Sequence, residues 1–293
     1  MLIAVLLSQC EKDDPQVTIP DDNFLNALIE LGVDTDGDGI ISPAEAEAII
    51  SLDVSKDSIS DMTGIEKFIN LDTLFCYDNQ LTTLDVSNNT ALEYLWCYDN
   101  QLTTLDVSNN TTLEFLFCDA NQLTTLDVSN NTALTCLDCR GNQLTTLDVS
   151  NNTALIYLYC GRNQLTTLDV SNNTALTELS CSDNQLTTLD VFNCTTLIRL
   201  SCYKNQLTVL DVSNNTAIAT LNCGSNQLTT LNISENINLF SGFGPWSSIQ
   251  GFLDLSHMPT LYKVCVWEMP FPPAGVSVYT DDSPNIYFTT DCD

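Results

Sequence analysis

The chain has 293 residues and a formal net charge of −30 at pH 7, from 38 acidic and 8 basic side chains. Such an anionic surface disfavours nucleic acids and anionic membranes as partners, because it repels their phosphate groups. The single histidine, His257, excludes a histidine-rich zinc centre and limits any nucleophile–histidine pair to that residue. Hydrophobic residues make up 44% of the chain, enough for a packed core, and no apolar run reaches the roughly 18 residues of a membrane-spanning helix.

The N-terminus carries a short apolar run, residues 2–7, that ends just before Cys10 and an acidic segment, Glu11-Lys12-Asp13-Asp14. Residues 1–9 resemble a bacterial lipoprotein signal peptide, although Gln9 replaces the usual small residue and no basic residue precedes the run. The resemblance implies that Cys10 is lipidated and that residues 10–19 are a linker. The acidic segment resembles the export tag of surface lipoproteins in Bacteroidetes-type bacteria. The alternatives are a chance cysteine in a frayed terminus and a true start upstream of Met1.

Residues 34–45 match the twelve-residue calcium loop of an EF-hand. In that pattern three aspartates supply carboxylates, Gly39 permits the sharp turn, and a glutamate closes the coordination sphere. The predicted calcium ligands are Asp34, Asp36, Asp38, Ile40 (through its backbone carbonyl), Ser42 and Glu45. Residues 20–58 are therefore predicted to form a helical N-terminal cap. Sensor EF-hands occur in pairs and one loop is present here, so a structural calcium clip is favoured over a sensor; an acidic turn without metal is the alternative.

From Leu71 to Leu239 the sequence repeats every 21 residues. Each of eight copies carries L-x-x-L-x-C-x-x-N-x-L, beginning in the first copy with Leu71, Leu74 and Cys76. This leucine-rich-repeat pattern predicts a solenoid over residues 59–239 with a parallel β-sheet on its concave side. Twenty-one residues leave no room for a full helix, so the convex side is expected to be extended or 3₁₀. After Leu239 the period fails, and residues 240–293 are predicted to form a β-containing C-terminal cap.

Eight cysteines recur with the repeat and are predicted to line the core. Each lies two residues after a core leucine and so points to the same inward face of its strand, where a free thiol acts as a small hydrophobe. They are Cys76, Cys97, Cys118, Cys139, Cys160, Cys181, Cys202 and Cys223. Cys136 occupies an outward strand position instead, which makes it the candidate for a reactive thiol. Cys265 and Cys292 lie outside the repeats and are a candidate disulfide.

Two polar columns accompany the repeat. The asparagines that begin at Asn79 are expected to bond the backbone of adjacent turns, because buried polar groups need partners. The aspartates stack like charges and must therefore be solvated, bonded to backbone donors or shared with cations such as calcium. They are Asp85, Asp106, Asp127, Asp148, Asp169, Asp190 and Asp211.

The copies differ from one another mainly at the outward-facing strand positions, which the fold does not dictate. Aromatic residues occupy these positions in the first three copies and the fifth, whereas the last three copies are mostly polar there. The aromatic residues are Phe75, Tyr77, Tyr94, Trp96, Tyr98, Phe115, Phe117, Tyr157 and Tyr159. Exposed aromatic rows are typical of binding faces, because they give large contact area at low entropic cost. The alternative is that the rings pack on each other and only stiffen the sheet.

Together these motifs resemble the leucine-rich-repeat surface lipoproteins of Bacteroidetes-type bacteria, related to internalin-like proteins, over roughly residues 10–293. The resemblance implies a monomeric, non-enzymatic adhesion module that binds a protein or a carbohydrate on its concave face. It also implies attachment to the outer membrane through the lipid alone, or else a secreted or periplasmic location. Two alternatives stay open: a structural envelope lipoprotein without a specific ligand, and a redox enzyme acting through Cys136.

Overall fold

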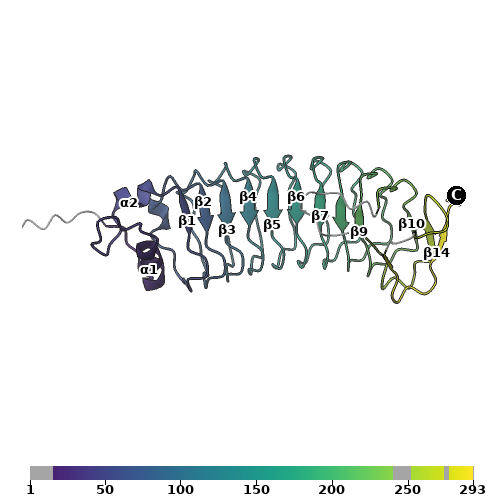
Figure 1. Ribbon diagram of the computed structural model, residues 1–293, viewed down its shortest axis with the longest axis horizontal. Coiled ribbons are helices and arrows are strands. Elements are labelled where there is room, and N and C mark those ends of the chain that lie inside the picture. Colours follow the sequence, from purple (N-terminus) through teal and green to yellow (C-terminus); the bar gives the residue numbers. More distant parts are fainter. Residues whose placement is uncertain (1–15, 240–251, 274–276, 293) are drawn as a thin grey trace, which may run out of the picture.

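A computed structural model of the chain describes residues 16–239, 252–273 and 277–292. It is an elongated solenoid whose coils stack in chain order, with the helices gathered at the N-terminal end (Figure 1). The predicted leucine-rich-repeat solenoid is thereby confirmed. Among the helices of the described ranges, none combines the length and apolar character needed to cross a bilayer.

The helical segments are α1 (Asp22–Glu30), α2 (Pro43–Ala48) and the 3₁₀ turn η1 (Ile65–Lys67). The strands are β1 (Ser51–Asp53), β2 (Thr73–Phe75), β3 (Tyr94–Trp96), β4 (Phe115–Phe117), β5 (Cys136–Asp138), β6 (Tyr157–Tyr159), β7 (Glu178–Ser180), β8 (Arg199–Ser201), β9 (Thr220–Asn222), β10 (Thr230–Asn232), β11 (Leu253–Asp254), β12 (Lys263–Cys265), β13 (Val278–Tyr279) and β14 (Tyr287–Thr289).

Within the described ranges, eleven strands form one parallel sheet in the order β1 to β9, then β11 and β13. The register is uniform, since each central leucine pairs with its counterpart one coil later, as Leu74 does with Leu95 and Leu95 with Leu116. Equivalent residues therefore lie side by side in columns along the whole sheet. A second parallel sheet, β10–β12–β14, lies at the C-terminal end.

Leucine, valine and cysteine fill the interior. The central strand leucines and the eight repeat cysteines are almost fully buried, as predicted from their inward positions. Between residues 71 and 239, all of which the structure describes, the chain forms turns and no helix opposite the strands. This agrees with the expectation of a largely extended convex side.

The structure differs from the predicted layout at both ends of the solenoid. The first coil begins at β1, inside the segment expected to be a helical cap, because Leu52 pairs with Leu74. The described part of the predicted C-terminal cap continues the coils: Leu253 pairs with Leu221, and Val278 with Leu253. These coils are longer than 21 residues, so a fixed period does not detect them. Asp21 joins the cap to the first coil by accepting hydrogen bonds from Phe24 and from the backbone and hydroxyl of Ser60.

The asparagine column that begins at Asn79 connects each coil to its neighbours. Asn142, for example, donates from Nδ2 to the carbonyls of Cys118 (3.0 Å) and Cys139 (3.1 Å), and its Oδ1 accepts from the backbone N–H of Leu123 (2.9 Å). The residue before the asparagine turns the chain through a positive φ, as Gly141 does at 64° and Asp78 at 54°. One side chain thus satisfies three buried backbone groups.

A second buried asparagine column, which the sequence analysis did not single out, begins at Asn89. Asn152 is typical: it donates to the carbonyls of Val128 (2.9 Å) and Asn131 (2.8 Å), while its Oδ1 accepts no hydrogen bond among the described residues. In one coil this column holds Cys194, whose Sγ lies 3.6 Å and 3.7 Å from the matching carbonyls of Val170 and Asn173. The single S–H of this thiol faces both carbonyls and can donate to one of them at a time, so it replaces part of the donor role of the asparagine.

The two columns predict different responses to the same substitution. Asn142→Cys should destabilise the protein by about 2 kcal/mol more than Asn152→Cys, because a thiol cannot replace an acceptor and two donors at once. Urea denaturation of both variants measures the difference. Equal losses would contradict the assigned roles.

Candidate functional site

The outward-facing residues of the main sheet form two columns within the strands and a third just after them, on the concave face. In the first coils these columns are aromatic. Phe75 stacks on Trp96 with ring centroids 4.3 Å apart, and Trp96 meets Phe117 edge-on at 5.2 Å. Tyr77 and Tyr98 stack at 4.5 Å. Such pairs stabilise the sheet beyond the area they bury.

These rings, which we call the aromatic band (Phe75, Tyr77, Tyr94, Trp96, Tyr98, Phe115 and Phe117), are half-buried and partly open to solvent. Face-to-face stacking along the sheet covers much of the ring faces and leaves the edges outward. The rings therefore pack on each other, as one hypothesis expected, and still present apolar surface on the concave side. Ligand binding by the band stays a prediction.

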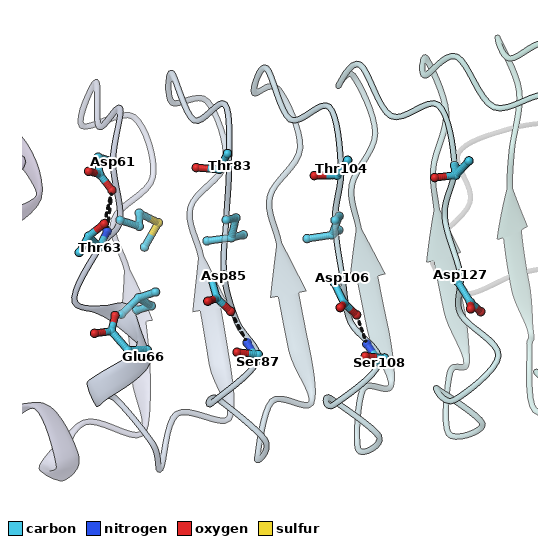
Figure 2. A pocket seen from close by; sticks show the side chains of 15 residues that line it. Asp61, Thr63, Glu66, Thr83, Asp85, Ser87, Thr104, Asp106, Ser108 and Asp127 are labelled. Carbon is cyan, nitrogen blue, oxygen red and sulfur yellow. Dashed lines mark hydrogen bonds between the residues drawn. The ribbon is translucent and has the colours of Figure 1, made fainter.

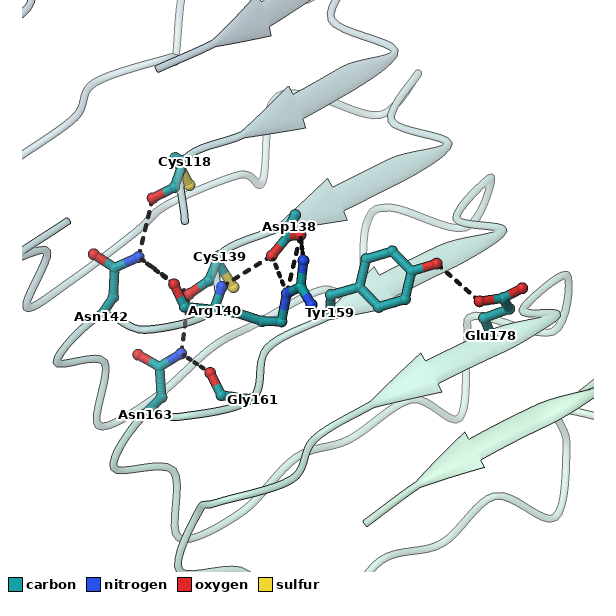
Figure 3. Close-up of polar contacts among 9 residues, drawn as sticks. All are labelled: Cys118, Asp138, Cys139, Arg140, Asn142, Tyr159, Gly161, Asn163 and Glu178. Carbon is teal, nitrogen blue, oxygen red and sulfur yellow. Dashed lines mark hydrogen bonds and ion pairs between the residues drawn. The ribbon is translucent and has the colours of Figure 1, made fainter. Parts of the chain in front are cut away.

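Beyond the aromatic band, charged residues cross the concave face in a connected row (Figure 3). Asp138, buried on β5, accepts hydrogen bonds from Nε of Arg140 at 2.9 Å and 3.0 Å. The Arg140 guanidinium lies 5.2 Å from the ring centroid of Tyr159, a cation–π distance. The Tyr159 hydroxyl donates to Glu178 (2.9 Å), and Glu178 also pairs with Arg199. Two cations and two anions thus balance in this row.

Asp119 lies near the end of this row and has an unusual carboxyl group. Burial first, and then the neighbouring Asp138 carboxylate, raise its pKa to about 6. A carboxyl group so placed resists ionisation, because its charged form loses solvent and meets a second carboxylate.

Cys136 is not the accessible thiol that its outward position predicted. It is buried, because the register places it between the rings of Phe115 and Tyr157 on the adjacent strands. Burial raises its pKa to about 12, with Asp138 contributing. A thiolate at this position is disfavoured, so the residue does not provide a reactive nucleophile.

The remaining cysteines divide as follows. The eight repeat cysteines are buried free thiols, and burial raises the pKa of each; the pKa of Cys97 rises to about 12. Cys265 and Cys292 form a disulfide in the structure, with Cα atoms 5.4 Å apart. Cys10, the predicted lipidation site, lies outside the described residues.

The predicted calcium loop brings three carboxylates together. Ligand oxygens of Asp34, Asp36 and Asp38 lie within 4.8 Å of one another. Asp34 also accepts from the backbone N–H groups of Gly37 (2.7 Å) and Gly39 (2.9 Å), which shapes the loop around it. Such an oxygen cluster suits a hard divalent cation.

The other predicted ligands of the loop take part in capping. Ser42 is the N-cap of α2 and forms a reciprocal capping box with Glu45. The Glu45 carboxylate also accepts from Thr35, and these donors, the Ser42 backbone N–H first, lower its pKa to about 2. Glu45 is therefore ionised near the loop, as a calcium ligand must be. Ile40, the remaining predicted ligand, donates its backbone N–H to Asp38 (2.9 Å).

The first three residues of the aspartate column, Asp85, Asp106 and Asp127, line an acidic groove of about 1080 Å3 over the first coils (Figure 2). Asp85 accepts from the backbone N–H of Ser87 (2.9 Å), and the equivalent bond recurs from Ser108 to Asp106. The Ser87 hydroxyl and N–H hold the pKa of Asp85 below its usual range. Solvent exposure and hydrogen bonds from backbone N–H groups thus stabilise the stacked carboxylates. A cation bound at this column stays a prediction.

Sequence reasoning did not find the ionic row. Its members lie in four different repeats, so their contacts depend on the register of β5 to β8 and not on any local motif. The one available signal was that Arg140 and Arg199 interrupt a repeat region that is otherwise poor in cations.

Comparison with known proteins is consistent with this geometry. The LVIVD repeat family matches residues 156–183 and 201–221. Internalin J of Listeria monocytogenes serotype 4b (strain F2365) is 46% identical over 71 residues, which are 24% of this chain and 8% of that protein. The solved functional domain of InlJ from Listeria monocytogenes, described as including a cysteine ladder, shares 34% identity with a TM-score of 0.67; the match covers 91% of this chain and 61% of that one.

The chain has a leucine-rich-repeat fold similar to that of the internalins. The internalin-like chain spans less than two thirds of either relative. A leucine-rich-repeat protein of Leptospira interrogans shares the fold at 24% identity, with a TM-score of 0.63 over 80% of this chain and 62% of that one.

The raised pKa of Asp119 predicts a pH-dependent difference between the native protein and Asp119→Asn. Because the folded state holds this proton more tightly than the unfolded state, native stability falls as pH rises from about 4 to 6. The variant should therefore match the native protein near pH 4 and exceed it above pH 6 by roughly 1 kcal/mol, allowing for partial exposure. Denaturant titrations at several pH values measure the gap; a gap that is constant with pH would contradict the assignment.

Proposed function

We propose that this internalin-like chain is a non-enzymatic cell-surface module that binds a protein ligand on its concave face. The observation that carries the proposal is the aromatic band on β2, β3 and β4. Its rings occupy positions that the repeat framework leaves free, and they keep partly exposed apolar surface. Aromatic residues are the anchors that dominate protein interfaces.

A protein ligand is favoured over a carbohydrate by the arrangement of the rings. Sugar rings pack on the faces of aromatic side chains, whereas the stacking of Tyr77 on Tyr98 and of Phe75 on Trp96 covers these faces. Ring edges and the shallow apolar surface between them suit apolar side chains of a protein. A structural envelope lipoprotein without a ligand is the alternative.

We further propose that the loop at Asp34, Asp36 and Asp38 holds calcium as a structural clip, with Glu45, Ser42 and the Ile40 carbonyl completing the site. The carboxylate cluster and the ionised Glu45 support this assignment. A cation there would join the turn between α1 and α2, next to the first coil. Display at the bacterial surface through a lipid on Cys10 belongs to the same proposal.

The aromatic band can be tested on an array of secreted and cell-surface proteins and glycans probed with the labelled full chain. The Trp96→Ala/Phe117→Ala double variant should lose at least about tenfold in affinity for the protein it binds, since two interface anchors are truncated.

The matched control is Phe192→Ser, which removes an exposed ring away from the concave strands and restores the serine that most other repeats carry. It should bind like the native chain. Equal losses in both variants would contradict the assigned surface, and the absence of any protein signal would favour the structural alternative.

Calcium should stabilise the protein by a measurable amount. At 10 mM calcium and a dissociation constant of roughly 0.1–1 mM, typical of extracellular modules, binding adds about 1.4–2.7 kcal/mol. Thermal melting with calcium and with chelator compares the native chain with Asp34→Asn. The native melting temperature should rise by several degrees and that of the variant should not; the same rise in both would overturn the site.

A further inference from the structure

The acidic groove of about 1080 Å3 lies on the convex side of the solenoid, and none of its lining residues belongs to the aromatic band. Figure 2 looks onto this side, with the strands of the main sheet behind the labelled side chains. Residues 61–66 border the groove at its N-terminal end, and the next coils continue it through Asp85, Asp106 and Asp127. The aspartate column runs on to Asp211, beyond the groove, so the groove distinguishes the first coils from the later ones.

The groove is lined by five carboxylates and by no basic side chain. They are Asp61, Glu66, Asp85, Asp106 and Asp127. Within the described ranges, Glu66 has a cation partner, Lys67 at 3.8 Å, and the four aspartates have none. All four aspartates are exposed. A ligand that supplies positive charge therefore complements this surface.

Hydrogen bonds keep the aspartates of the column ionised. The backbone N–H of Ser129 donates to Asp127 at 2.9 Å, and the equivalent bonds reach Asp85 and Asp106. The serine hydroxyl first, and then the serine N–H, lower the pKa of each of these three aspartates. The negative charge of the groove is therefore retained in mildly acidic solution.

The aspartates form a row of separate charges and not a metal site. Asp85 and Asp106 pair in parallel, which spaces equivalent residues of adjacent coils about 5 Å apart. In the calcium loop, by contrast, three ligand oxygens lie within 4.8 Å of one another, and among the described residues the groove aspartates form no such group. The row thus suits several cations carried by one ligand better than a single metal ion.

The groove is also large and partly apolar. Its volume exceeds the range of about 300–1,000 Å3 that is typical of small-molecule pockets, so it has room for a stretch of polypeptide. Met62, Ile65, Leu84 and Leu105 contribute apolar surface beside the carboxylates. Lysine and arginine combine an apolar stem with a terminal cation, which matches this pairing of surfaces.

We propose that the groove binds a lysine- or arginine-rich segment of a protein partner, with the cations on the aspartate row and the stems on the apolar surface. The charge complementarity of the groove carries this assignment. The inference goes beyond the proposed function, because it concerns the side of the solenoid opposite the aromatic band. Both surfaces can therefore be occupied at the same time.

The test measures fluorescence anisotropy of a labelled peptide of about twelve alternating lysine and alanine residues, titrated with the full chain at about 50 and 300 mM sodium chloride. The native chain should bind it, and more weakly at the higher salt. Asp85→Asn/Asp106→Asn/Asp127→Asn should weaken binding at least about tenfold, because three charge pairs are lost. Asparagine fits this column, since Asn232 occupies it and accepts from Ser234 (3.0 Å).

The matched control is Asp169→Asn/Asp190→Asn/Asp211→Asn. It removes the same number of charges from the same column beyond the groove, so it should weaken binding less than about twofold. Urea denaturation checks that both variants are as stable as the native chain. Trp96→Ala/Phe117→Ala should leave peptide binding unchanged, so a failure of the aromatic band is distinguishable from a failure of the groove.

Several results would overturn the proposal. Equal losses in the two triple variants would show attraction to the overall negative charge and not to the groove. The absence of binding, binding that is independent of salt, or equal binding of a glutamate–alanine peptide would each contradict charge complementarity. If spermine binds as tightly as the lysine peptide, the occupant is a small polyamine and not a polypeptide segment.

Discussion

The structure depends on one constraint: the backbone groups of each turn are buried between coils and must find hydrogen bonds there. The strands are only three residues long, so the sheet satisfies few of these groups. Asn142 and its equivalents supply what the sheet cannot, because one amide has two donors and an acceptor and joins its own coil to the preceding one. The bond works only if the same residue recurs at the same place in every coil, which is why the 21-residue period is so strict.

That strictness determines where function can reside. Inward strand positions hold leucine or cysteine, turn positions hold asparagine, and the positions before the asparagines must accept a positive φ. The outward strand positions vary most between the copies, and the parallel register aligns them into columns. Aromatic stacks in the first coils and the row from Asp138 to Arg199 follow from that alignment, since they depend on contacts between residues of adjacent coils. The concave face thus combines residues that vary between copies with a regular spacing set by the register.

Much of this could be predicted from the sequence, and the failures have physical causes. The 21-residue period predicted that Leu74 and Cys76 face inward and that the convex side is extended, because the same residue types recur at the same positions in every copy. It could not reveal the burial of Cys136, which depends on the size of Phe115 and Tyr157 in neighbouring coils. Nor could it extend the sheet to Leu253, which lies 32 residues after its partner Leu221. Contacts between coils, such as those of Arg140 and Glu178, need the register as well as the sequence.

Alkylation of the native protein, mapped by mass spectrometry, tests the coil arrangement most directly. The structure places ten free cysteines in the interior, including Cys76 at one end of the ladder and Cys223 at the other. All ten should resist iodoacetamide under native conditions and react once denaturant unfolds the stack. Rapid labelling of the repeat cysteines in the folded protein would show that the strands do not turn these residues inward, and the concave surface described above would then not exist.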